Sequence, residues 1–147
     1  MIYKKRALKF NLVAEKSPFN SVKITQSKVA YDFLRPLMFD DLLLREVFFV
    51  LTLNRANNVT GYAHISTGGI SGTVVDVRII AKIAVDALAA SIILAHNHPS
   101  GSTQPSEADK QITAKIASAM KLLDVVVLDH IIMTDESFFS FADNGLI

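Results

Sequence analysis

The fold class of this chain is limited first by a short apolar run, residues 91–95, that stands between two helical patterns. In residues 76–90 and 106–123, apolar side chains recur at helical spacing, as Ile112 and Ile116 do in the second segment. A core strand that is entered and left through helices favours local parallel pairing inside a mixed sheet. The chain is therefore predicted to be an α/β or α+β protein of at most three layers.

Further elements are predicted on both sides of this unit. Residues 26–38 carry another helical stripe, and residues 54–58 form a polar turn. The other strands are expected at residues 46–53, 59–67, 125–133 and 137–141. A chain of 147 residues is long enough for one core. We expect one domain over residues 22–147, preceded by an edge strand or arm over residues 1–21.

Composition excludes several classes of protein. Half of the residues are hydrophobic and a fifth are charged, as in a globular protein. The absence of Cys rules out disulfides, thiolate zinc sites and the zinc deaminase signature. No apolar stretch is long enough to span a bilayer, and the N-terminus lacks the apolar segment of a signal peptide. A cytoplasmic protein without a membrane contact is the simplest expectation.

The charge is distributed unevenly along the chain. Residues 1–28 hold seven basic side chains and one acid, Glu15, whereas the remainder is net acidic. A solvated, loosely held terminus is the favoured interpretation of this segment. The alternative is a weak nucleic-acid contact through phosphates, without the interleaved aromatic residues of a binding platform.

A candidate metal site follows the central strand directly. His96 and His98 stand two residues apart, so a strand can turn both imidazoles to the same side. Together with the carboxylate of Asp109 they form a ligand set that suits Zn²⁺, and three protein ligands leave the fourth position for water. Ser106 and Asp109 also have the spacing of a helix N-cap and its capping box. Both interpretations can hold together, because a helix N-terminus is a rigid place for a ligand.

A zinc hydrolase also needs a general base and a donor to the oxyanion. Glu46 is the candidate base, because an acid is unusual at the start of a hydrophobic strand. An ordinary charge at a strand end is the competing interpretation, and the sequence alone does not favour catalysis. Ser106 is the candidate oxyanion donor if it lies beside the metal, although capping is the commoner duty of such a serine.

The pattern His-x-His, seven residues, then Ser-x-x-Asp, with an upstream Glu on a strand, resembles the JAMM (MPN+) metallopeptidases. The amino-acid sequence of residues 96–101 and 105–109 resembles, more narrowly, the RadC branch of this family. The RadC branch is also matched by four further short segments, at residues 45–48, 93–95, 128–130 and 140–143. The whole resemblance covers residues 22–147. It implies a twisted mixed sheet packed between helices, and cleavage of peptide or isopeptide bonds. It further implies zinc on His96, His98 and Asp109, Glu46 as the base and Ser106 at the oxyanion.

Some features depart from this family. Longer RadC relatives carry a helix-hairpin-helix DNA-binding domain, for which this chain has no room, and this argues against a DNA role. The loop at residues 68–73 is richer in glycine than the family suggests, and we expect it to alter substrate access. His130 is predicted to be a hydrogen-bonded core histidine rather than a fourth ligand. His64 is predicted to be structural or exposed.

Three functional hypotheses follow from these observations. The first is a zinc-dependent peptidase or isopeptidase that acts on a protein or peptide. The second is an accessory module of DNA repair or DNA processing in which zinc is structural. The third is a metal-dependent nuclease. Zincin-type proteases are excluded, because the sequence has no His-Glu-x-x-His.

Overall fold

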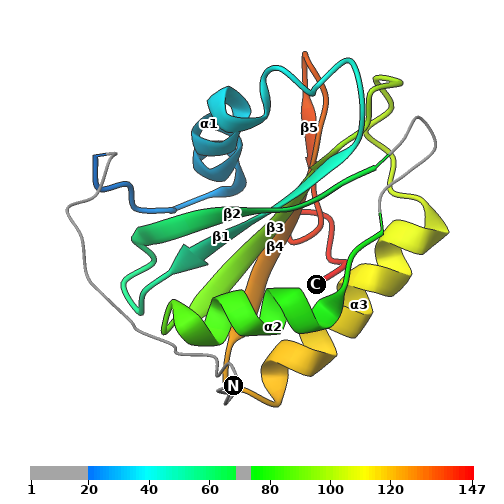
Figure 1. Ribbon diagram of the computed structural model, residues 1–147. Helices are drawn as coiled ribbons and strands as arrows, with labels where there is room; N and C mark the ends of the chain where they lie inside the picture. Colours follow the sequence, from blue (N-terminus) through cyan, green and yellow to red (C-terminus); the bar gives the residue numbers. More distant parts are fainter. Residues whose placement is uncertain (1–19, 69–73) are drawn as a thin grey trace, which may run out of the picture.

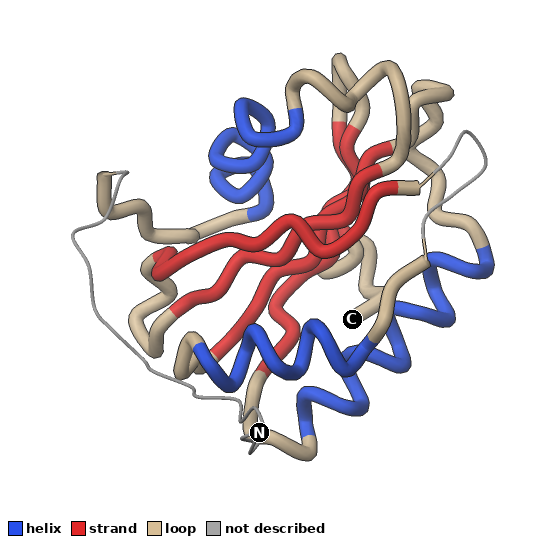
Figure 2. Tube along the Cα trace, in the orientation of Figure 1, coloured by secondary structure: helices blue, strands red, loops and turns tan. Residues whose placement is uncertain are grey.

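The structure, a computed structural model, describes residues 20–68 and 74–147. Five strands form one mixed sheet, with α1 on one face and α2 and α3 on the other (Figures 1 and 2). The fold is thus α+β with three layers, as predicted. Its elements are α1 (Ser27–Met38), β1 (Val47–Leu53), β2 (Val59–Thr67), α2 (Val77–Asp86), β3 (Ser91–Asn97), α3 (Glu107–Lys121), β4 (Val126–Met133) and β5 (Phe138–Ser140).

The strand order is β2-β1-β3-β4-β5. β3 and β4 are joined through α3 and pair in parallel, as expected for a strand next to a helical crossover. On its other side β3 pairs antiparallel with β1, so the expectation of parallel pairing holds for one neighbour alone. The reason is that β1 lies between β2 and β3, which the α2 crossover connects, and β1 runs antiparallel to both.

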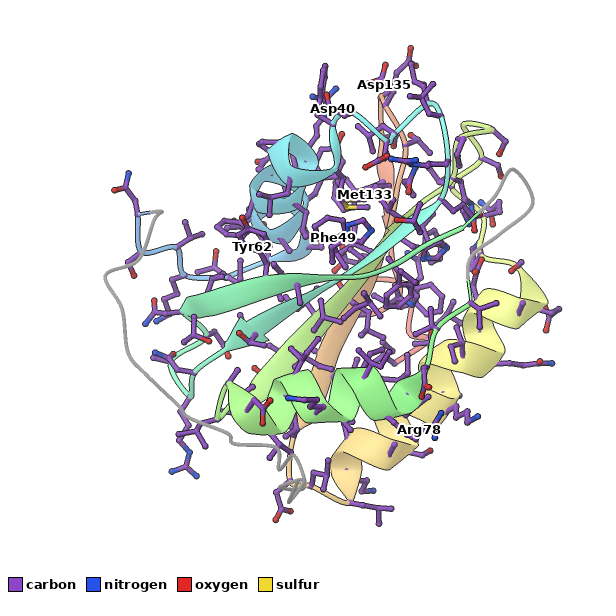
Figure 3. All side chains as sticks on the ribbon, viewed as in Figure 1. Asp40, Phe49, Tyr62, Arg78, Met133 and Asp135 are labelled. Atoms are coloured by element: carbon purple, nitrogen blue, oxygen red, sulfur yellow. The ribbon has the colours of Figure 1, made fainter. Side chains whose placement is uncertain are left out.

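β1 is buried along its whole length because both faces of the sheet are covered. Phe49 and Leu51 pack in the core beneath α1, whereas Phe48 and Val50 pack against α2 and α3. Figure 3 shows Phe49 and Met133 on the α1 side of the sheet. This two-sided burial explains why the strand reads as a continuous apolar run rather than as alternating apolar and polar residues.

A register shift in the β3–β4 pair determines which β4 side chains face α3. Ile92 pairs with Val127, but the next residue of β3, Ile93, pairs with Asp129. Leu128 is therefore an extra residue, and the alternation of side chains changes phase there. As a result His130 pairs with Leu94 and lies on the α3 side of the sheet, the same side as His96.

Several element boundaries differ from the sequence predictions, most of them by one or two residues, and two of the differences have a structural consequence. The helix predicted at residues 76–90 ends at Asp86, because Leu88 adopts a left-handed backbone with φ of 50°. The strand predicted at residues 91–95 continues to Asn97, so His96 belongs to the strand itself. Within the described ranges, no helix is long and apolar enough to cross a membrane. The predicted arm over residues 1–21, except its last two residues, and most of the loop at residues 68–73 lie outside the described residues.

Candidate metal centre

Three predicted ligands meet where β3 ends and α3 begins. Nε2 of His96 lies 2.9 Å from Nε2 of His98 and 3.2 Å from Oδ1 of Asp109. Nε2 of His98 lies 3.4 Å from Oδ2 of Asp109. One potential ligand atom from each residue lies within 4.8 Å of the others, so this cluster could hold a metal ion.

The turn after β3 fixes the ring of His98. Its backbone N–H donates to the carbonyl of Met133 at 2.9 Å, which extends the parallel ladder by one residue. Gly101 then turns the chain with φ of 85°, a value that a residue without a Cβ adopts easily. Nδ1 of His98 lies 2.8 Å from the carbonyl oxygen of Ser102. Because a carbonyl can only accept, Nδ1 carries the proton, and in the neutral ring the lone pair is on Nε2, toward the cluster.

Asp109 is held by the capping box at the start of α3. Its Oδ2 accepts from the backbone N–H of Ser106 at 2.7 Å, and Oγ of Ser106 accepts from the N–H of Asp109 at 3.1 Å. The predicted capping box is therefore confirmed. The same carboxylate faces both imidazoles, so the side chain of Asp109 both caps the start of α3 and completes the cluster.

The cluster favours a negative carboxylate beside protonatable rings. Burial opposes ionisation of Asp109, but the adjacent imidazoles of His96 and His98, which donate to its carboxylate from Nε2 when they are protonated, outweigh burial and hold the pKa of Asp109 well below its usual range. The hydrogen bond to Asp109 raises the pKa of His98 despite partial burial, and the Ser102 carbonyl and the charge of Glu46 add to this rise. Without a metal, His98 and Asp109 thus tend to form an ion pair. A bound cation would take the place of that proton.

His130 lies behind His96 rather than among the ligands. It is fully buried, and its ring stacks on Phe141 with centroids 4.8 Å apart. Nε2 of His130 lies 2.8 Å from Nδ1 of His96, and Nδ1 lies 2.6 Å from Oγ1 of Thr113. Burial lowers the pKa of His130 far below its usual value, so the ring is neutral. The prediction of a hydrogen-bonded core histidine is confirmed.

Glu46 lies immediately before β1 and is half-buried. The antiparallel register pairs Phe48 with His96, and continuing it by two residues brings Glu46 to the level of His98. The contribution of Glu46 to the raised pKa of His98 agrees with this placement. Within the described residues, Glu46 is not one of the three clustered ligands. The structure thus places the candidate base beside the cluster but outside its ligand set.

The sequence analysis missed Asn97, which lies between the two histidine ligands. Its fully buried side chain accepts from the N–H of Val47 at 2.8 Å and donates to the carbonyl of Arg45 at 2.9 Å and that of Asp41 at 3.1 Å. Asn97 therefore fastens the segment that contains Glu46 to the strand that bears His96. A polar amide at the end of an apolar strand was the available signal.

Two other polar residues, His64 and Asp129, lie away from the cluster. The ring of His64 stacks on Phe49 and bonds to Thr67 at an exposed position of β2, in line with a structural or exposed role. Asp129 is buried and its side chain accepts from Ser140 and from the backbone of Ala142, next to the α1 side of the sheet. Burial raises the pKa of Asp129 despite these bonds. These bonds hold Asp129 on the α1 side of the sheet, the face opposite to the one on which His96 and His130 lie.

Comparison with known proteins agrees with this geometry. A family model described as the RadC-like JAB domain matches residues 24–146. UPF0758 proteins of Flavobacterium johnsoniae and Porphyromonas gingivalis are 48% and 45% identical to the chain; each match covers 84% of this chain and 53% or 54% of the relative. The UPF0758 protein YfjY of Escherichia coli is 42% identical, with 86% of this chain and 78% of the relative covered. The chain thus spans about half the length of the first two relatives. None of these three names states an activity.

Proposed function

Because this chain belongs to the family of RadC-like JAB domains, we propose that it is a zinc-dependent hydrolase of the JAMM metallopeptidase type, which cleaves a peptide or isopeptide bond. Its substrate would be a protein or peptide. The observation that carries this proposal is the convergence of His96, His98 and Asp109, whose potential ligand atoms lie within 4.8 Å of one another.

The chemistry of the donor set fits zinc. Zinc, a cation of intermediate softness, binds both imidazole nitrogens and carboxylate oxygens, and a site of three protein ligands is typical of catalytic zinc. Zinc, when bound, supplies a Lewis acid that polarises a carbonyl and lowers the pKa of a coordinated water. The hydrogen bonds from His98 to Ser102 and from Ser106 to Asp109 are the outer contacts that orient such ligands.

Glu46 is the proposed general base. It lies at the level of His98 by the register of β1 and β3, yet it is not among the clustered ligands. A carboxylate in that position can accept a proton from the attacking water and deliver it to the leaving amine. Asn97 holds the backbone on both sides of Glu46, at Arg45 and Val47, which limits the positions that the carboxylate can reach.

Ser106 is the proposed donor to the developing oxyanion. It is exposed, and it directly precedes α3, the helix that carries Asp109. Its Oγ accepts one hydrogen bond from the N–H of Asp109, which leaves the hydroxyl proton for another acceptor. A carbonyl oxygen of the substrate beside Asp109 would be such an acceptor. The capping bond and the catalytic contact use different lone pairs and protons of one hydroxyl, so they are compatible.

The experiment that tests this function is a cleavage assay on a peptide library that includes isopeptide-linked lysines. Zinc-loaded wild type, Glu46→Gln and the matched control Glu136→Gln would be compared by mass spectrometry, since Glu136 lies exposed in the turn before β5. We expect new termini with wild type and Glu136→Gln that are absent with Glu46→Gln. A zinc-loaded wild type that yields no cleavage, or cleavage that Glu46→Gln retains in full, would count against the proposal.

A further inference from the structure

A line of buried hydrogen bonds connects the backbone of α3 to the inner nitrogen of His96. Oγ1 of Thr113 donates to the carbonyl of Asp109 at 2.6 Å and lies 2.6 Å from Nδ1 of His130. Nε2 of His130 then lies 2.8 Å from Nδ1 of His96. The line begins at the main chain of one proposed ligand and ends at the ring of another.

Counting protons gives each bond in this line a direction. The hydroxyl of Thr113 has one proton, and a carbonyl can only accept, so that proton goes to Asp109. Thr113 must then accept from Nδ1–H of His130. A neutral His130 with its proton on Nδ1 has a lone pair on Nε2, which accepts from Nδ1–H of His96. The remaining lone pair of a neutral His96 is on Nε2, the atom that faces His98 and Asp109.

We propose that Thr113 and His130 are positioning residues that hold His96 in the Nδ1–H form and direct its Nε2 lone pair toward the metal. This role rests on the proposed metal site, because it concerns the ring that would bind zinc. Such outer partners are how proteins fix the tautomer and orientation of a ligating histidine. Here the partner is a second neutral histidine, and its own tautomer is set by a threonine.

Burial protects these hydrogen bonds from competition with water. The exposed fractions of Thr113, His130 and His96 are 2%, 0% and 3%, so water cannot easily replace any member of the line. Phe48 lies parallel to the ring of His96, with centroids 6.0 Å apart, and contacts His130 edge-on at 5.5 Å. Because Phe48 is apolar, it offers no competing hydrogen-bond partner to the nitrogens of His96 and His130 on this side.

Thr113 also couples the two ligand-bearing elements. It lies one helical turn after Asp109 and bonds to the carbonyl of that residue, while its oxygen supports His130 on β4. The separation between the start of α3 and the end of β3 is therefore linked to the ring orientation of His96. The helical pattern of the sequence gives no sign of this role, because a threonine among apolar residues on one face of a helix is typical of an ordinary core position.

The direct test is histidine-selective ¹H–¹⁵N NMR of the metal-free protein at about pH 9, above the usual histidine pKa. A neutral imidazole in water prefers the Nε2–H form, so a fixed Nδ1–H form is diagnostic. We expect His96 and His130 both to carry their protons on Nδ1. An Nε2–H signal for either ring would overturn the proposal, whether or not the protein binds zinc.

Three threonine variants test the consequence for the metal. Thr113→Val removes the hydroxyl and should lower zinc affinity by roughly 10–100-fold, the usual effect of losing an outer partner. Thr113→Ser keeps the hydroxyl and should retain the affinity and the NMR pattern. Thr52→Val is the matched control, because Thr52 is also 2% exposed but bonds to Thr60 on β2. It should leave zinc affinity unchanged even if it lowers the melting temperature.

The outcomes separate this inference from the proposed function. If wild type shows both Nδ1–H forms but binds no zinc, the positioning line stands and the metal proposal fails. If wild type binds zinc and Thr113→Val binds it as tightly as Thr113→Ser does, the metal proposal stands and the positioning role is wrong. Equal loss of affinity in Thr113→Val and Thr52→Val would reduce the effect to general destabilisation and overturn the role.

Discussion

Oδ1 of Asn97 accepts a hydrogen bond of 2.8 Å from the N–H of Val47. Val47 follows Glu46, the proposed base, and Asn97 separates His96 from His98, the proposed ligands. One buried amide therefore joins the two segments whose relative position the proposed chemistry requires. The spatial relation between Glu46 and the histidines is set by this bond together with the pairing of β1 and β3.

Asn97→Asp is predicted to destabilise the fold strongly. The carboxylate can still accept from Val47, but it has no proton to donate to the carbonyls of Arg45 and Asp41. We expect a loss on the order of 3 kcal/mol in urea unfolding of the metal-free protein, as for a buried group left unsatisfied. In the control Asn54→Asp, the contacts of the side chain within the described residues are acceptor contacts, from Ala56 and Asn58, so a carboxylate should fit there. Similar losses in the two variants would contradict the role of the Asn97 amide.

Glu46→Gln is predicted to separate metal binding from catalysis. The amide is nearly the same size but cannot accept a proton, so the rate should fall by roughly 10²–10⁴-fold, as for the loss of a general base. Zinc content should stay at the wild-type level, since Glu46 is not one of the clustered ligands. Loss of zinc from Glu46→Gln would instead make this residue a ligand.

The stability of the metal-free protein is predicted to fall as the pH rises above about 6.5, the ordinary pKa of histidine. The folded pKa of His98 is raised through its bond to Asp109, so the interaction stabilises the fold below about pH 6.5, the unfolded value. This stabilisation is lost as the pH rises through the raised folded value. Urea unfolding with a chelator across this range should show the decline in wild type and a flatter profile in His98→Gln, which carries no titrating ring.

Zinc is predicted to reverse this trend. The metal binds the deprotonated imidazole, so the stability that zinc adds should increase with pH over the same range. Melting curves with and without zinc at several pH values would measure the difference. If the stability that zinc adds does not depend on pH, zinc binding does not displace a proton from His98, and this prediction is wrong.

Deletion of residues 1–21 is predicted to leave the metal site intact. The described contacts of the N-terminal segment with the sheet begin at Val22, whose carbonyl accepts from Val59, and at Ile24, which donates to Asn57. Any DNA binding should be weak, steeply salt-dependent and lost on deletion, because it would depend on the basic side chains of this segment. Tight DNA binding by the truncated protein at physiological salt would favour a DNA-processing role instead.

Local features of the site were predictable from the sequence. The Ser106–Asp109 capping box depends on spacing within one helical turn, and the structure shows both of its hydrogen bonds. Apolar periodicity located each helix and strand, with an error at the end of α2 where Leu88 takes a left-handed backbone. His-x-His after an apolar run indicated the cluster, because strand alternation makes such rings neighbours.

Contacts between distant segments were not predictable in this way. The position of β1 between β2 and β3 follows from packing of the whole sheet, which no local pattern records. The extra residue at Leu128 changes the face on which His130 lies, and a strict alternation of side chains through β4 would have placed it on the α1 side. The bonds of Thr113 and His130 to Asp109 and His96 depend on both features.

Metal content is the measurement that tests the central proposal most directly. Elemental analysis would compare wild type, His98→Ala and His64→Ala after identical zinc loading and dialysis; His64 lies on β2, outside the cluster. The site predicts about one zinc ion per chain in wild type and in His64→Ala, and a large loss in His98→Ala, which removes one of three ligands. Equal zinc in all three proteins, or none in wild type, would contradict the assignment of His96, His98 and Asp109 as a metal centre.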